Sequence, residues 1–570
     1  MKTQFLVARG ASNNQPPTDS APNQGAAIAP SRPRRAMLSL RAVTMALLIL
    51  SSLTRNAAGV IPLGGTVTTS GDQIYNDAVV LISDTTVMST GGGNIVFNAT
   101  VDGPYRLTII TSGASILNGP VGNSQPLAAL TTATAGGTVL NGGTVTTFDA
   151  QTYNDALVLG GNLTMASLGG GIISFNSTVD GMQALTIAAA GLSVFNGPVG
   201  QATPLMSLTT DTGTTLLNGG TVTTLGAQTY NRAVVLGANL NMASMGGGII
   251  IFNSTVDGLQ ALTVATAGVS IFNGAVGGAT ALMSLTTDTG STVLNGGTVA
   301  TVGAQTYNRA VVLAGNLTVA SMGAGGITFN STVDGAQSLT VATAGVSVFN
   351  GAVGGTTALT SLATDIGGAT FLNGGMVTTT GAQIYDDAVT LLSNTTLTAS
   401  QATIAVSLTT SSVSTIAAAL INTGRIVVNG GTLKFLGTVT NSGMIQAGGG
   451  GVLNFVGSVF NTGVIDALAG KVTFSGGLSN KGTVVDATSF RLTTIRRVGN
   501  DIRLTWSTMA GHRYVVQATA PSAGGGYTKT FSDLGPILSA PGNAQSTLSY
   551  NHVGGATGSR SRFYRVRLVE

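Results

Sequence analysis

Short runs of alternating apolar and polar residues, separated by glycine and asparagine, fill most of the chain. The stretch FNSTVDGLQALTV, from Phe252 to Val264, is typical, because its final QALTV alternates and Asn, Asp and Gly interrupt it. Alternation with a period of two predicts strands that have one buried and one exposed face. Valine and threonine also favour strands over helices. The pattern therefore predicts many short strands and almost no helix.

The same phrases return at a nearly constant spacing. A phrase of the type QTYNDA recurs along the chain and places its tyrosine at Tyr75, Tyr153, Tyr230, Tyr307 and Tyr385. The aspartate of the VDG phrase recurs with the same spacing, at Asp102, Asp180, Asp257 and Asp334. Self-similarity at a fixed period is typical of a repeat architecture, so we divide residues 60–400 into units of about 77 residues.

A shorter period appears after residue 420. Phrases such as INTGRIVV and FNTGVIDA place asparagine at nearly even intervals, at Asn422, Asn441, Asn461 and Asn480. Four asparagine phrases also occur within one longer unit, at Asn231, Asn253, Asn273 and Asn295. We therefore expect each long unit to contain four coils of about 19 residues.

A coil of this length cannot bury its own apolar face, but stacked coils share a continuous interior. The sequence therefore predicts an all-β chain with a long parallel β-solenoid, most simply a right-handed β-helix, of about 22 coils and on the order of 100 Å. We expect Phe252 and Val256 in the interior, and Asn253, Asp257 and Gly258 at a corner, with asparagines hydrogen-bonded from coil to coil. A bundle of hairpins or immunoglobulin-like domains would fit the long unit but not the shorter spacing after residue 420.

The N-terminal region reads as a leader followed by a secretory signal peptide. Four arginines (Arg32, Arg34, Arg35 and Arg41) precede a short apolar core, 42–53, and the small residues 57–59 follow it. This order of charge, apolar core and small residues is typical of export signals. The alternative is a membrane anchor, which would need about 20 apolar residues. We therefore predict a secreted or cell-surface protein, whose start is Met1 or Met37, with no stable membrane span beyond the signal segment.

Composition and charge narrow the choice of chemistry. The chain has no cysteine, which excludes disulfides, thiolate metal sites and a cysteine nucleophile. Acids outnumber basic residues in 60–400, whereas basic residues outnumber acids in 490–570. An acidic rod should not attract nucleic acid. The scattered positive charges at the C-terminal end predict a solvated face, including Arg565 and Arg567.

From about residue 490 the repeat stops. The stretch RLTTIRRVGNDIRLTWSTMAGHRYVVQATA alternates apolar and polar residues, as antiparallel strands do. The short length of this segment and the single tryptophan, Trp506, predict a small antiparallel β-sandwich at 488–570. This segment resembles the fibronectin-III-like modules that close many secreted bacterial repeat proteins. Such a module would cap the solenoid or act as a sorting signal.

The longer repeat suggests a family. The run GAQTYNRAVVLGANLNMASMGGGIIIFNSTVDGLQALTVATAGVSIFNGAVGG resembles repeats of large secreted bacterial proteins of the filamentous-haemagglutinin and autotransporter type. The resemblance covers residues 60–400, and the coils up to 487 continue it. It implies export, a β-helical rod and adhesion or display at the cell surface. The chain departs from autotransporters because its end, SRFYRVRLVE, leaves too little room for a membrane β-barrel.

The recurring acids are the first candidates for catalysis, because many polysaccharide lyases and hydrolases are β-helices. A catalytic group of residues is normally built once, whereas the VDG aspartates keep the repeat. The acid of the tyrosine phrase (Asp77 and Asp155) is replaced by arginine in two units (Arg232 and Arg309). Four coils would separate successive aspartates by about 19 Å, whereas two carboxylates acting on one glycosidic bond lie at most about 9.5 Å apart. We interpret these acids as turn residues that bond their own backbone.

No metal, cofactor or catalytic residue is therefore predicted. Calcium needs several oxygen ligands, but the TDTG phrases at Asp211 and Asp288 supply one acid each and the calcium-binding nonapeptide is absent. The two histidines, His512 and His552, are expected at the surface or in turns. The GGG runs lack the lysine and helix of a phosphate-binding loop, so they predict turns.

The sequence thus divides into 1–59 (leader and signal peptide), 60–400 (the long repeats), 401–487 (the short coils) and 488–570 (C-terminal module). We expect an exported, non-enzymatic rod that acts as a surface adhesin or as an extracellular structural or display element. Its partner would be a cell-surface, glycan or matrix ligand. Two alternatives remain, a carbohydrate-active β-helix enzyme and an inert spacer that presents the C-terminal module.

Overall fold

The computed structural model describes residues 59–570, apart from 133–134, 212, 487–490, 509–512, 522–526, 541–545, 558–561 and 570. The predicted signal peptide lies outside the described residues. All regular elements in the described part are β-strands, as the sequence predicts. In the described ranges there is no helix with the length and apolar character needed to cross a membrane.

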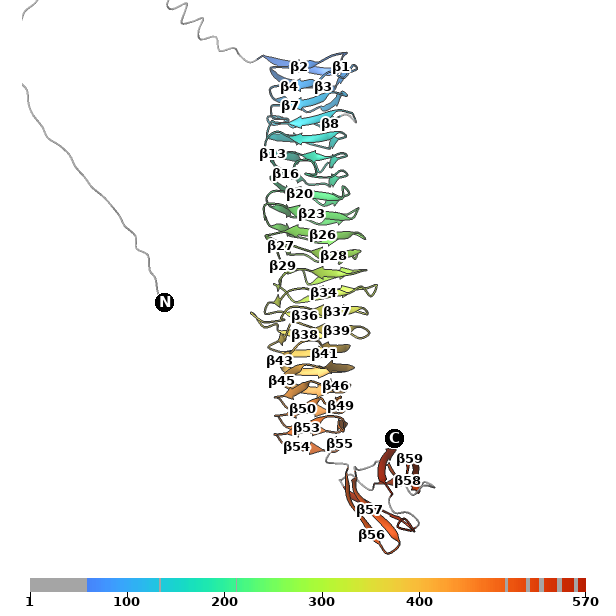
Figure 1. Ribbon diagram of the computed structural model, residues 1–570. Helices are drawn as coiled ribbons and strands as arrows, with labels where there is room; N and C mark the ends of the chain where they lie inside the picture. Colours follow the sequence, from blue (N-terminus) through green and yellow to red (C-terminus); the bar gives the residue numbers. More distant parts are fainter. Residues whose placement is uncertain are drawn as a thin grey trace, which may run out of the picture. The chain divides into compact units, whose positions relative to one another are not determined.

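Residues 60–486 form a parallel β-solenoid of about 21 turns (Figure 1). Each turn has three sides, and each strand pairs in parallel with the strands of the turns before and after it. On one side, for example, Tyr153 is the register partner of Phe175, which in turn is the partner of Phe195. The prediction of a long parallel β-solenoid is therefore confirmed, with a turn count close to the expected one.

The strands fall on three faces, which we call A, B and C. Single-residue bridges join the sheets of one face where a strand is too short to continue the ladder, as at Val179–Val199–Val222 on face C. Four long strands bend from face A to face B: β1 (Val60–Thr69), β3 (Ala78–Ser89), β43 (Thr396–Ile404) and β45 (Val413–Asn422). Face A contains β5 (Val101–Asp102), β10 (Thr144–Thr147), β13 (Leu163–Ser167), β16 (Ala184–Ala189), β18 (Ser207–Thr210), β21 (Gln228–Tyr230), β24 (Ile250–Phe252), β27 (Val269–Phe272), β29 (Ser291–Leu294), β32 (Val311–Leu313), β35 (Val333–Asp334), β40 (Met376–Thr378), β47 (Thr432–Phe435), β50 (Val452–Phe455) and β53 (Lys471–Phe474).

Faces B and C complete each turn. Face B contains β6 (Arg106–Ile110), β8 (Ala129–Thr132), β11 (Gln151–Tyr153), β14 (Ile173–Phe175), β17 (Ser193–Phe195), β19 (Thr215–Leu217), β22 (Val234–Leu236), β25 (Val256–Asp257), β30 (Thr298–Thr301), β33 (Leu317–Ser321), β36 (Ser338–Thr343), β38 (Ser361–Thr364), β41 (Ala382–Tyr385), β48 (Val439–Asn441), β51 (Val459–Asn461) and β54 (Leu478–Asn480). Face C contains β2 (Gln73–Tyr75), β4 (Ile95–Phe97), β7 (Ala114–Leu117), β9 (Gly137–Leu140), β12 (Ala156–Leu159), β15 (Val179–Asp180), β20 (Thr221–Thr224), β23 (Leu240–Ser244), β26 (Ala261–Thr266), β28 (Ser284–Thr287), β31 (Gln305–Tyr307), β34 (Ile327–Phe329), β37 (Val346–Phe349), β39 (Ala369–Leu372), β42 (Ala388–Leu391), β44 (Ser407–Thr410), β46 (Arg425–Asn429), β49 (Met444–Gly448), β52 (Val464–Ala467) and β55 (Thr483–Asp486).

The long repeat does not coincide with whole turns. Between the tyrosine strand of one unit and that of the next, the chain passes through eleven strand or bridge positions, which is three and two-thirds turns. Tyr75 therefore lies on face C, Tyr153 on face B and Tyr230 on face A. The expectation of four coils of about 19 residues per unit is wrong, because most turns in this region are longer than that. Successive register partners along face B, at positions 173, 193, 215 and 234, are unevenly spaced.

After residue 400 the repeat and the turn become the same length. Asn422 is the register partner of Asn441, which is the partner of Asn461 and then Asn480. These strands all lie on face B. Identical residues therefore form straight columns here, whereas in the long units they move around the three faces.

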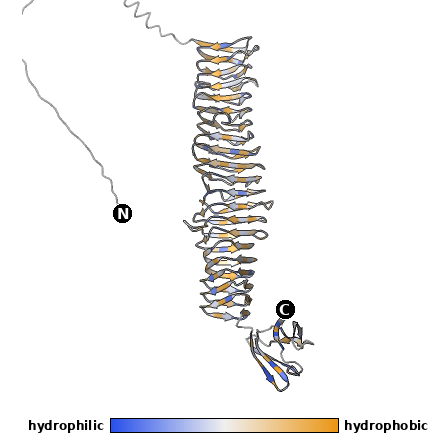
Figure 2. Cartoon of the chain, in the orientation of Figure 1, coloured by the Kyte–Doolittle hydropathy of each residue, from blue (hydrophilic) through white to orange (hydrophobic). Residues whose placement is uncertain are grey.

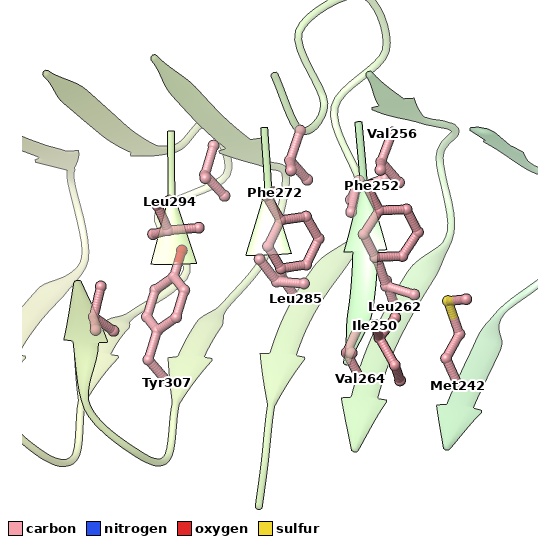
Figure 3. Close-up of a cluster of buried hydrophobic side chains, with 14 of the residues drawn as sticks. Met242, Ile250, Phe252, Val256, Leu262, Val264, Phe272, Leu285, Leu294 and Tyr307 are labelled. Carbon is pink, nitrogen blue, oxygen red and sulfur yellow. The ribbon is translucent and has the colours of Figure 1, made fainter. Parts of the chain in front are cut away.

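Columns of apolar side chains fill the interior. The rings of Tyr230 and Phe252 stack with centroids 5.2 Å apart. Phe252 and Phe272 stack with centroids 5.0 Å apart, and Leu294 continues the column (Figure 3). Phe252 and Val256 are buried, as the sequence predicts. In Figure 2 the stacked turns are mostly orange or pale, since the polar strand residues are largely threonine and serine rather than charged groups.

The C-terminal segment forms small antiparallel sheets, as predicted. Leu504, Trp506, Tyr514 and Val516 share one buried cluster. One sheet contains β56 (Leu492–Val498), β57 (Asp501–Thr508) and β61 (Ser546–His552). The other contains β58 (Arg513–Pro521), β59 (Tyr527–Asp533), β60 (Leu538–Ser539) and β62 (Tyr564–Val569).

Candidate functional site

Each VDG aspartate binds the backbone of the following turn. Oδ1 of Asp257 accepts hydrogen bonds from the backbone N–H groups of Ala279 (2.8 Å) and Thr280 (3.1 Å). The same pair of bonds recurs for Asp102, Asp180 and Asp334. These acids thus hold the corner loop of the next turn. The prediction that they bond their own backbone is wrong, since the bonded N–H groups belong to the following turn.

The glycine after each of these aspartates fits only because it lacks a side chain. Gly258 has φ of 129°, and a Cβ atom there would lie 2.4 Å from the carbonyl oxygen of Leu236 on the preceding turn. The VDG phrase is therefore a corner element: valine faces the interior, aspartate binds the next turn, and glycine allows the close approach of the previous turn.

The VDG aspartates do not face one another. Asp102 lies on face A, Asp180 on face C, Asp257 on face B and Asp334 again on face A. Successive aspartates are thus separated both along the axis and around it. No pair of them can act on one glycosidic bond, which needs two carboxyl groups within about 9.5 Å.

Two acids of the tyrosine phrase are buried. Asp155 accepts hydrogen bonds from the hydroxyl groups of Thr132 (2.8 Å) and Thr138 (2.9 Å), and Asp387 has the equivalent threonine partners. Burial raises the pKa of both carboxyl groups above the usual value, and the threonine hydroxyls offset part of that rise. Asp77 on the first turns is exposed.

The two arginines at the equivalent position point to the surface. Arg232 and Arg309 are exposed, and in these units the two threonines bond each other directly, as Thr215 does to Thr210 at 2.9 Å. Thr292 and Thr287 make the same bond. The position therefore tolerates either charge, because the threonine pair is satisfied with or without a carboxylate.

Asparagine ladders run along the corners, as the sequence predicts. Asn253 Nδ2 donates to Asn231 Oδ1 at 2.7 Å, and Asn273 Nδ2 donates to Asn253 Oδ1 at 2.9 Å. Each unit has four such residues, and the ladder stops where another residue replaces the fifth, which is Gly160, Gly237, Ala314 or Leu392. A Cβ atom at Gly160 would overlap the side chain of Asn141. The ladders are exposed, and those of successive units lie at different corners of the solenoid.

The tyrosines of the repeat are also structural. The hydroxyl of Tyr153 donates to Oε1 of buried Gln151 (3.1 Å), and Nε2 of Gln151 donates to the carbonyl oxygen of Ala166 (2.8 Å). Burial raises the pKa of Tyr153 well above its usual value of 10.0. The phenol therefore stays protonated and serves the interior of the rod.

The other candidates that the structure describes make local contacts. Asp211 and Asp288 accept a hydrogen bond from Asn231 and Asn308. Among the described residues, no three acidic or histidine side chains gather as a metal site. The GGG runs form turns, and Gly92, Gly170 and Gly247 have positive φ. His512 lies outside the described residues. His552 is within 2.9 Å of the Tyr564 hydroxyl, and burial followed by the charge of Arg562 lowers its pKa.

The sequence matches no protein-family model, no curated protein and no solved structure. The fold and the surface of this chain are therefore the basis for inferring its function.

One surface feature escaped the sequence analysis. A depression of about 300 Å³ lies at the corner between faces A and B, lined by Pro104, Gln125, Pro126, Ala128 and Phe148. These residues all belong to the first unit (residues 75–152). A position-by-position comparison of the units would have found them, because most of them differ from their counterparts. Phe148, for example, corresponds to Leu225, Val302 and Thr380.

Proposed function

We propose that this protein is an exported, non-enzymatic rod that acts as a surface adhesin or as an extracellular structural or display element. The observation that carries the proposal is the use of the recurring polar groups. The VDG aspartates and the asparagine ladders bind the next turn, so they maintain a long column instead of forming a reaction centre. A continuous rod of this kind suits presentation of a surface at a distance from the cell.

The sequence resemblance to filamentous-haemagglutinin and autotransporter repeats supports the same proposal. Proteins of that type are exported, and a parallel β-solenoid of about 21 turns is compatible with their rods. The positively charged segment and short apolar core before residue 59 favour export as well.

Location is the decisive measurement. Antibodies against residues 490–570 would be applied to intact cells that produce the full chain, and to the culture medium. We expect signal on the cell surface or in the medium, and loss of that signal when Leu48 and Leu50 in the apolar core are both changed to aspartate. Retention of the unchanged chain in the cytoplasm would contradict the proposal.

Enzymatic action needs a separate test. The purified full chain would be incubated with a panel of polysaccharides, and new reducing ends or unsaturated products would be measured. We expect no turnover. Turnover that disappears on a single change such as Asp102→Asn would favour the carbohydrate-active alternative.

A further inference from the structure

The depression between faces A and B combines apolar and polar groups on three successive turns. The backbone N–H of Ala128 donates to the carbonyl oxygen of Tyr105, and that of Asp149 donates to the carbonyl oxygen of Ala128, both at 2.9 Å. The loop with Pro104 and Tyr105, the loop of residues 125–128 and the corner with Phe148 therefore lie one above the other. Together they span about 10 Å along the axis.

Phe148 is the most unusual residue of this corner. Its side chain is 65% exposed, whereas the stacked phenylalanines of the long repeat, such as Phe175 and Phe252, are buried. On one side its ring lies against Gly169 of the next turn, where a Cβ atom would come within 2.8 Å of Cε1. The ring is thus supported from behind and lines the depression together with Pro104 and Pro126. An aromatic ring held in this way is a platform for a flat apolar ligand surface.

Polar side chains accompany the platform. Gln125 lines the depression, and Tyr105 and Asp149 are the chain neighbours of Pro104 and Phe148. All three are exposed, and within the described residues their side chains have no hydrogen-bond partner. An amide thus lines the apolar floor, and a phenol and a carboxylate lie one residue along the chain from lining residues. This combination differs from a purely apolar patch, which would carry aliphatic groups alone.

The comparison between units shows that this set of residues occurs once. Tyr105 corresponds to glutamine in the other three units, Gln125 to threonine, and Asp149 to glycine. The counterparts of Pro104 and Ala128 in the second unit are Met182 and Met206. The backbone scaffold is repeated, but the side chains at this corner occur only in the first unit, apart from Pro126, which corresponds to Pro204 in the second. That is the pattern expected of a site added to a scaffold rather than of the scaffold itself.

We propose that this corner, the Phe148 site, binds a neutral hexose ring of a glycan. A pyranose has faces of C–H bonds, which carry partial positive charge and pack on the negative face of an aromatic ring. Its edge carries hydroxyl groups, which both donate and accept hydrogen bonds. The carboxylate of Asp149 accepts from hydroxyls, while the amide of Gln125 and the phenol of Tyr105 can do both. A volume of about 300 Å³ lies at the low end of the range for small-molecule pockets, so one or two rings fit.

The inference rests on the proposed function in one respect, because only an exported rod would meet glycans at a cell surface. The binding itself is a property of the purified chain. It can therefore be tested apart from export and location.

The test uses the full chain and a panel of immobilised oligosaccharides built from glucose, galactose and mannose, with a proline-rich peptide and a charged polysaccharide alongside. The strongest binder is then titrated by calorimetry. The key variant is Phe148→Thr, because threonine occupies this backbone position in the fourth unit, at Thr380, and is tolerated there. The matched control is Leu225→Thr, which makes the same change at the equivalent position of the second unit.

We expect binding to at least one neutral oligosaccharide. Phe148→Thr should weaken it by about tenfold or more, while Leu225→Thr leaves it unchanged. Tyr105→Gln and Gln125→Thr, which also restore residues of other units, should weaken it less. Circular dichroism of both threonine variants should equal that of the parent chain.

Three results would overturn the inference: binding to none of the neutral oligosaccharides, equal binding by Phe148→Thr, or binding of the peptide instead of any glycan. Failure of the two proposals can be told apart. A chain that is exported but binds no glycan contradicts only the Phe148 site, whereas a chain that binds glycan but stays in the cytoplasm contradicts only the proposed function.

Discussion

The side-chain amide of Asn441 donates a hydrogen bond of 2.7 Å to Oδ1 of Asn461 on the next turn, and both residues are buried. Asn422 donates to Asn441 in the same way, and Asn461 donates to Asn480. The amides of Asn422, Asn441 and Asn461 form a buried chain along one face, where water does not compete for them, and Asn480 at its end is exposed. Such a chain fixes the register of successive turns, because a slip would leave several buried polar groups unpaired.

We predict that Asn441→Ala destabilises the turns around residues 422–461. The change removes the donor to Oδ1 of Asn461, at about 1–3 kcal/mol for an unsatisfied buried group, and one of the three acceptors of the Asn422 amide. Hydrogen exchange of peptides from these turns gives the free energy of local opening. The control is Asn253→Ala in an exposed ladder, where water replaces the lost partners and the cost should stay near or below about 1 kcal/mol. Equal effects of the two changes would contradict the special role of the buried column.

Asp155 predicts an unusual dependence of stability on pH. Burial raises the pKa of its carboxyl group above the usual 3.8. The folded state therefore binds the proton more tightly than the unfolded state does. The contribution of Asp155 to the free energy of unfolding is fully present below the pKa that its carboxyl group has in the unfolded chain. It is lost as pH rises through the pKa of the same group in the folded chain. After correction for intrinsic exchange, the turns around Asp155 should be better protected in acid than at neutral pH.

The measurement is hydrogen exchange of peptides that cover residues 130–160, compared at both pH values. Asp155→Asn should remove this component, because an amide does not ionise, while still bonding both threonine hydroxyls. The junction of the second and third units offers an internal control, since Arg232 is exposed and Thr215 bonds Thr210 directly. If peptides around Thr215 gain protection in acid as much as those around Asp155, the carboxyl group is not the cause.

Much of the rod could be predicted from the sequence, because its rules are local. Alternation places Phe252 and Val256 inside, and the asparagine of each phrase marks a corner. The number of turns per unit could not be predicted by counting asparagines. The step from Asn295 to Asn308 is shorter than one turn, so the ladder restarts at another corner. One strand in each unit is also reduced to a single bridge, such as that at Val276.

For Asp257, the sequence predicts the turn position but not the hydrogen-bond partners. Its sequence neighbours identify a turn residue, but its partners, Ala279 and Thr280, come near only through the winding of the coil. The Phe148 site was missed because the sequence patterns considered were those that the units share, and Phe148 differs from its counterparts in the other units. A residue that departs from three otherwise matching units is the signal that would have found it.

The aromatic columns predict a graded response to substitution. Phe252 stacks between Tyr230 and Phe272 in the interior, so Phe252→Ala should cost about 3–5 kcal/mol by leaving a cavity. Leucine occupies the same column two turns later, at Leu294, so Phe252→Leu should cost about 1.5 kcal/mol or less. Local opening by hydrogen exchange in β24 and β27 measures both. Similar costs for the two variants would mean that the column does not need to be filled.

Two glycine-to-alanine changes, at Gly258 and at Gly71, should differ strongly in their effect on stability. Gly258→Ala forces a Cβ atom onto a residue with φ of 129° and to 2.4 Å from the Leu236 carbonyl oxygen, so the loop and the previous turn must separate. We expect a loss of about 2 kcal/mol or more in the stability of these turns, from strain and overpacking combined. At Gly71 no atom lies within 4 Å of the added Cβ, so Gly71→Ala should change stability by about 0.5 kcal/mol or less. Proteolysis at the mutated corner of each variant (residues 257–261 and the turn around Gly71), followed by mass spectrometry, checks both variants against the parent chain. Cleavage of Gly258→Ala no faster than that of Gly71→Ala would show that the solenoid can widen at this corner without cost.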